Sequence, residues 1–299
     1  MTSPPLPRTR ESLEAAIRAI VAPPHSDAIV AAIEPCIAFR ARPCDETDLQ
    51  LGASRMGGMP DVPVDFEWPW WNPPNDGIEG KPAVRSVDPR PLHFIAQIRL
   101  ADLSVYEEAH DLPSSGWLLF FYDGENQPWG FDPADRAGAR VVHLDCPESS
   151  LKRTSGPSSE AFDSVLCSLV SARKWTAPRW PADLPEEFVE NYSELMEGRT
   201  QLPRHQLLGH PDQIQGDMRV EAQLVSNDMN SGDGRVVDDP RYESVAARAG
   251  DWRLLFQVDT DEAGPGWMWG DAGRIFYWIR SDDLAAARFD AAVLLLQCG

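Results

Sequence analysis

The sequence predicts an α+β fold in which antiparallel β-strands dominate and short helices lie at the N-terminus and in the middle of the chain. Helical spacing of apolar residues occurs near the start and again in residues 181–198. Elsewhere the apolar residues form runs of strand length that end at glycine or proline. Three of these runs recur in the same order in the last third of the chain. The 299 residues, 42% hydrophobic and 25% charged, suffice for one large or two ordinary domains.

The opening residues predict two short helices. The segment RESLEAAIRAIV repeats its apolar residues at helical spacing, on the stripe Leu13, Ile17, Ile20 and Val21. Ser26 is a suitable N-cap for a second helix, and Pro35 is expected to end it. We therefore expect an N-terminal helical segment at residues 1–35 and the main domain at residues 36–299.

The last third of the chain resembles an earlier part and predicts a duplicated β unit. WRLLFQVDTD resembles LHFIAQIRLAD, with Gln257 in the place of Gln97. GRIFYWIR resembles GWLLFFYD, and AAVLLLQ resembles ARVVHLD. The expected halves span about residues 36–150 and 200–299 and are joined by a helical acidic segment.

The charge of the chain is strongly negative and unevenly spread. The formal net charge is −20, which disfavours nucleic acid and anionic membranes as direct partners and favours a basic protein. Residues 181–262 contain 18 acidic and 7 basic side chains, a difference of 11. The polar loop in this region offers four aspartates as candidate partner-binding residues, namely Asp228, Asp233, Asp238 and Asp239. No apolar run approaches the length of a membrane span or a signal core, so we expect a soluble cytoplasmic chain.

The segment DFEWPWWNPPNDG places three tryptophans in what its prolines predict to be a loop. Trp68 is expected to pack under the following strands, whereas Trp70 and Trp71 are expected to be exposed for partner contact. An alternative is a small-molecule or peptide cleft lined by tryptophans, namely Trp68, Trp70, Trp71, Trp267 and Trp269.

Tests for known chemistry give no convincing catalytic motif. The five cysteines include no C-x-x-C pair, and G-x-S-x-G and a P-loop are both absent. HQLLGHPD contains His205, His210 and Asp212, but its i, i+5 histidines do not share a helical face. A loop could still gather them, which leaves a metal-dependent hydrolase as the weakest alternative. We therefore predict no enzyme activity, catalytic residue, metal or cofactor.

The order of several motifs is similar to that of the YwqG-like family, a bacterial family of unknown function. The motifs are GASRMGGMPDVP, FEWP, PLHFIAQIRLADL, LPSSGWLLFFYD, QPWGFDP, HQLLGHPDQIQGDM, LLFQVDTD, MWGDAGRIFYWI and DLAAARFDAAVLLLQC. The resemblance covers roughly residues 36–298 and implies an α+β fold rich in antiparallel strands. Its polar positions, for which we expect structural roles in turns and buried backbone pairing, include Arg55, Gln97, Gln257 and Asp271.

The resemblance also bears on function, because some members of the family resemble immunity proteins encoded near bacterial toxin systems. With the acidic charge, it predicts a non-enzymatic protein that binds and neutralises a cognate toxin. A basic nuclease is the expected toxin, because nucleases bind phosphate backbones with cationic surfaces.

Overall fold

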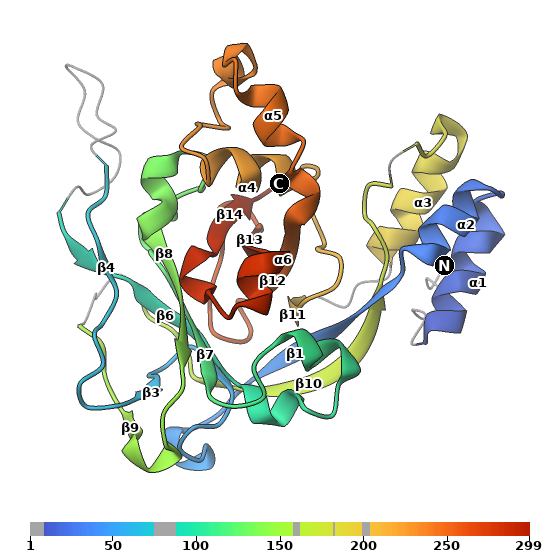
Figure 1. Ribbon diagram of the computed structural model, residues 1–299. Coiled ribbons are helices and arrows are strands. Elements are labelled where there is room, and N and C mark those ends of the chain that lie inside the picture. The colour runs from blue at the N-terminus through green and yellow to red at the C-terminus, as the bar shows by residue number, and fades with distance from the viewer. Residues whose placement is uncertain (1–8, 75–87, 158–161, 182, 199–203) are drawn as a thin grey trace.

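The computed structural model describes residues 9–74, 88–157, 162–181, 183–198 and 204–299 (Figure 1). The helices are α1 (Arg10–Ile20), α2 (His25–Ala31), α3 (Glu186–Gly198), α4 (Arg219–Val225), α5 (Tyr242–Ala246) and α6 (Ser281–Ala285). The strands are β1 (Glu34–Pro43), β2 (Arg55–Met56), β3 (Asp61–Val62), β4 (Trp70–Trp71), β5 (Arg90–Pro91), β6 (His93–Arg99), β7 (Trp117–Tyr122), β8 (Ala139–Leu144), β9 (Lys152–Arg153), β10 (Cys167–Thr176), β11 (His205–Leu207), β12 (Trp252–Asp259), β13 (Arg274–Arg280) and β14 (Val293–Gln297). The predicted α+β class, rich in antiparallel strands, is confirmed.

Ten strands form one antiparallel sheet in the order β14-β13-β12-β11-β1-β10-β2-β6-β7-β8. The sheet curves so strongly that its two edge strands, β8 and β14, come close to each other. The result is a nearly closed barrel (Figure 1). The Tyr277 hydroxyl on β13 donates to the carbonyl of Phe121 on β7 at 3.2 Å. The rings of Phe120 and Phe256 meet inside, with centroids 4.5 Å apart. The curvature therefore buries the inner face of the sheet against itself.

The sheet is built from two sets of strands with the same order. β2, β6, β7 and β8 follow one another on one side, as β11, β12, β13 and β14 do on the other. Arg55 pairs with Gln97 in the first set, and Gln206 pairs with Gln257 at the matching place in the second. Each set also has an irregularity in register just before its paired glutamine. It lies between Phe94 and Ala96 in β6 and between Leu254 and Phe256 in β12. The two strands at the centre are exchanged, because β1 pairs with β11 and β10 pairs with β2.

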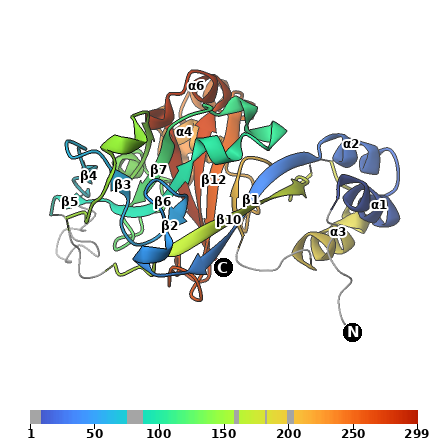
Figure 2. The same cartoon turned by 90° about the horizontal axis from the view of Figure 1, so that it is seen from below.

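The helices α1, α2 and α3 lie at one end of the β1–β10 ribbon and enclose a small core of their own (Figure 2). Its fully buried members include Leu13, Ile17 and Tyr192. Ser26 does not cap α2: the helix begins at His25, with Pro24 as its N-cap, and Ser26 is buried inside it. Pro35 does not act as a helix stop but lies in the second position of β1, where a missing amide donor is tolerated.

Matched tight turns follow β2 and β11, in the sequences MGGMPD and LLGHPD. Gly58 and Gly209 occupy the same place and have φ of +64° and +69°. A Cβ on Gly58 would lie 3.0 Å from Cβ of Leu166, and one on Gly209 would lie 2.7 Å from Cβ of Cys36. Both turns therefore need glycine for its left-handed backbone and for its close approach to a central strand.

We expect Gly209→Ala to lower the free energy of unfolding by about 2 kcal/mol or more, since it adds a steric clash to a left-handed backbone. Gly234→Ala is the matched control, because Gly234 has open space around its Cα and no positive φ. Urea denaturation of the purified proteins measures both. Equal midpoints for the two variants would contradict the proposed close approach.

Candidate functional site

The four aspartates predicted to face a partner lie between α4 and α5, in the part of the chain that stands out from the sheet in Figure 1. Asp228 and Asp238 are exposed, whereas Asp233 and Asp239 are half-buried. The Asp228 side chain is 81% exposed and forms an ion pair with Arg136 at 3.2 Å. The segment therefore presents carboxylates to solvent.

Two of these aspartates are neutralised by arginines two residues further along. Asp233 accepts hydrogen bonds from the backbone amide and the guanidinium of Arg235, and these bonds lower the pKa of Asp233 to about 2. Asp239 accepts the same set from Arg241, whose Nη2 lies 2.8 Å away. Asp238 has no ion pair among the described residues. Three of the four aspartates thus have an arginine partner, because Asp228 also pairs with Arg136. The acidic surface is consequently weaker than the residue count implies, and its most exposed carboxylates are those of Asp228 and Asp238.

The three loop tryptophans divide between core and surface. Trp68 packs as predicted, with Nε1 donating to the carbonyl of Leu92 at 2.8 Å. Trp70 is 54% exposed, but Trp71 is only 2% exposed and donates to a carboxylate oxygen of Asp123 at 3.0 Å. The expectation that Trp71 is exposed is therefore wrong. The two residues form β4, and neighbouring residues of a strand point to opposite faces.

Trp267 and Trp269 belong to the core rather than to an open cleft. They are 2% and 0% exposed, and the ring of Phe162 stacks on Trp267 with centroids 5.8 Å apart. Trp269 also meets Tyr122 from the first set of strands at 5.7 Å. The alternative of one cleft lined by these five tryptophans is therefore wrong, because Trp71, Trp267 and Trp269 are buried.

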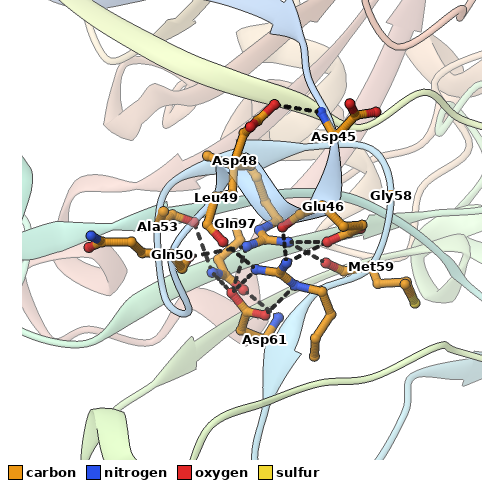
Figure 3. A network of polar contacts seen from close by, with 12 residues as sticks. Asp45, Glu46, Asp48, Leu49, Gln50, Ala53, Gly58, Met59, Asp61 and Gln97 are labelled. Carbon is orange, nitrogen blue, oxygen red and sulfur yellow. Dashed lines mark hydrogen bonds and ion pairs between the residues drawn. The ribbon is translucent and has the colours of Figure 1, made fainter.

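A buried network of charges surrounds Asp61 in the first set of strands (Figure 3). Its carboxylate pairs with Arg55 Nη2 at 2.9 Å and with Arg153 Nε at 3.0 Å. The amide of Asp61 donates to Gln97 Oε1 at 2.8 Å, and Glu46 closes the network at the surface. Arg55 is fully buried; desolvation lowers its pKa, and the charge of Asp61 opposes that shift. The charges of this network are thus paired with one another, as expected of residues with a structural role.

The second set repeats part of this network around Asp212. Gln257 Oε1 accepts from the amide of Asp212 at 2.8 Å, as Gln97 does from Asp61. The Asp212 carboxylate contacts Arg204 and lies 3.8 Å from Arg179. The turn that carries Asp212 lines an open cleft, whereas Arg153 and Glu46 cover the matching turn in the first set.

Asp271 lies in the exposed turn before β13, between Gly270 and Ala272, both with positive φ. It bonds an amide as expected of a turn residue, but through its backbone carbonyl, which accepts from Gly299 at 3.0 Å. Its carboxylate is directed to solvent rather than to a neighbouring amide among the described residues.

The two histidines considered as metal ligands have separate partners. His205 Nδ1 accepts from the amide of Asp259 at 3.2 Å, and its Nε2 lies 3.3 Å from the Asp261 carboxylate. His210 Nε2 donates to the carbonyl of Ala32 at 2.6 Å. Within the described part of the chain, no three His, Cys, Asp or Glu side chains are grouped as metal ligation requires.

A cleft of about 880 Å³ lies between α2, the segment that follows β10 and the outer face of β12 and β13. Trp252 and Trp278 are buried in its wall, and Trp180 lies at its edge with 46% of its surface exposed. His210 and Gly209 contribute the turn after β11. The volume lies within the range of about 300–1,000 Å³ typical of ligand sites. No sequence pattern indicates this cleft, because its lining brings residues 24–34 together with segments that begin at residue 178.

Among the described residues of the cleft, the arginines form ion pairs but two of the acidic side chains do not pair with arginine or lysine. Its three arginines all have acidic partners: Arg179 with Glu197 at 2.9 Å, Arg219 with Asp217, and Arg253 with Asp111 at 2.6 Å. By contrast, neither Glu34 nor Asp183 has an arginine or lysine partner among the described residues. Unsatisfied charge in the cleft is therefore negative.

These features define an α+β protein with an internally duplicated, nearly closed antiparallel sheet, an acidic projection and a side cleft. Residues 54–298 match a family described as a domain of unknown function, DUF1963, and the chain belongs to this family. No curated protein matches the sequence. The matched range begins just before β2, so that β1, at the centre of the sheet, precedes it. Within the described ranges, no helix has the length and apolar character needed to cross a membrane.

We expect Asp61→Asn to lower the free energy of unfolding by about 3 kcal/mol or more, because it leaves the buried Arg55 guanidinium without its countercharge. Asp233→Asn is the control, since it removes an exposed carboxylate that also pairs with an arginine and should leave the urea midpoint nearly unchanged. If Asp61→Asn unfolds at the wild-type urea concentration, the network does not hold the turn.

Proposed function

We propose that this protein is a non-enzymatic binding protein for a basic partner, and most concretely an immunity protein that binds and neutralises a cognate bacterial toxin. The observation that carries the proposal is the net charge of −20, with 18 acidic against 7 basic residues in positions 181–262. A nuclease toxin is cationic where it binds phosphate, so an acidic protein can cover the same surface. The resemblance to the YwqG-like family, some members of which resemble immunity proteins, supports the same role.

The α4–α5 projection supports this function because it carries Asp228 and Asp238 away from the sheet. Exposed carboxylates mainly accelerate the encounter with a cationic partner, and they do so most strongly at low salt. The exposed ring of Trp70 offers an aromatic anchor of the type that contributes most to binding energy once it is desolvated.

A second candidate is a small-molecule or peptide binding protein. The cleft of about 880 Å³ favours it, since its volume is typical of ligand sites and its wall combines buried indoles with polar and charged side chains. The aromatic side chains of this cleft are Trp180, Trp252 and Trp278, rather than those that the sequence indicated.

The neighbouring gene product tests the main proposal. We expect it to co-purify with this protein at 150 mM salt, on the order of physiological ionic strength, and to lose its toxicity when both are expressed together. No stable complex and no protection would refute an immunity role.

Charge neutralisation on the projection tests the binding surface. We expect Asp228→Asn combined with Asp238→Asn to slow association with the partner by about three- to tenfold at low salt, and by less as salt is raised. Asp282→Asn combined with Asp290→Asn changes the net charge equally at exposed positions elsewhere. Equal slowing by both pairs, measured by stopped-flow fluorescence, would assign the effect to net charge and not to the projection.

A further inference from the structure

We propose that the side cleft binds an extended segment of the partner protein that carries arginine. This proposal rests on the proposed function and deepens it, because it assigns the site and the chemistry that the partner presents. The observations behind it are the unpaired carboxylates of the cleft, an exposed indole at its edge and an unpartnered indole N–H in its wall.

Charge complementarity favours a cationic side chain. The three arginines of the cleft are each neutralised by a carboxylate, whereas Glu34 and Asp183 are not. The Glu34 side chain is 55% exposed and lies 4.0 Å from His210 Nε2. The charge of Glu34 acts on Arg219, but the two side chains form no ion pair. A guanidinium pairs well with a carboxylate, because it donates five N–H bonds in a planar fork.

The aromatic edge of the cleft favours the same group. Trp180 is 46% exposed and already lies beneath the guanidinium of Arg179, 5.9 Å from the ring centroid. The exposed part of this ring remains accessible to a second guanidinium, which is attracted by the negative ring face. Arginine is therefore preferred to lysine, since its plane stacks on indole as well as pairing with carboxylates.

A buried indole N–H in a residue that lines the cleft also lacks a hydrogen-bond acceptor within the described part of the chain. Trp278 is 1% exposed and lines the cleft, and its Nε1 has no hydrogen-bond partner among the described residues. Its neighbour Trp252 differs, because its Nε1 donates to Gln223 at 2.8 Å. A peptide backbone supplies carbonyl acceptors, which a free polyamine lacks. The volume of about 880 Å³ also exceeds what one side chain needs.

The test uses the full chain labelled with 5-fluorotryptophan and observed by fluorine NMR. The probe is a heptapeptide with two arginines among glycines and serines, and its control carries citrulline, the neutral isostere, at both positions. Trp180→Phe and Trp278→Phe assign the two resonances. We expect the arginine peptide to shift both, and the citrulline peptide to bind at least about fivefold more weakly.

Variants locate the site. Glu34→Gln combined with Asp183→Asn should weaken the arginine peptide by at least about fivefold, and asparagine tolerates the positive φ of Asp183. Asp228→Asn combined with Asp238→Asn should leave this affinity unchanged. Unmoved resonances, equal affinity for both peptides, or equal affinity for spermidine would each overturn the proposal.

The same variants separate this inference from the proposed function. If the partner binds the Glu34→Gln, Asp183→Asn protein as tightly as the wild type, the cleft is not its docking site and the immunity role stands. If no neighbouring gene product binds but the arginine peptide still shifts Trp180, the cleft chemistry stands and the immunity role falls.

Discussion

The structure depends on the pairing of β1 with β10 at the centre of the sheet. The two strands align over ten residue pairs, from Glu34 opposite Thr176 to Pro43 opposite Cys167. Each of the two strands also pairs with one set of strands, because β11 lies beside β1 and β2 lies beside β10. The two sets therefore share one continuous sheet, whose curvature encloses a common core. The same ribbon extends to the helices α1, α2 and α3 and so fixes one wall of the cleft (Figure 2).

Duplication leaves two copies of one turn with different surroundings. In both copies a glutamine side chain holds the amide of an aspartate, Asp61 in the first and Asp212 in the second. The first copy is sealed by Arg153, and its arginine, Arg55, has no exposed surface. In the second copy the turn lines the cleft, and His210 in this turn donates to the carbonyl of Ala32, just after α2. One copy of the turn is thus covered by charged side chains, and its counterpart lines the cleft.

The sequence was sufficient for the fold class for two reasons. Its apolar runs have the length of strands, and the order of its motifs is repeated, with Gln97 and Gln257 at matching positions. It failed where tertiary contacts decide the outcome. Trp71 is buried because β4 turns it towards Asp123, and no local pattern distinguishes it from the exposed Trp70. The acidic count overestimated the free charge, since pairing of Asp233 and Asp239 with arginines depends on turn geometry. The cleft was invisible because its walls come from distant segments.

The exchange of central strands also constrains how the chain can fold during synthesis. When β1 leaves the ribosome, its neighbours β10 and β11 lie about 130 to 170 residues ahead in the sequence. At translation rates of about 5–20 residues per second, β1 waits on the order of ten seconds for a partner. The nascent N-terminal half must therefore keep an unpaired apolar strand from aggregating, and closure of the sheet is a late, high-contact-order event.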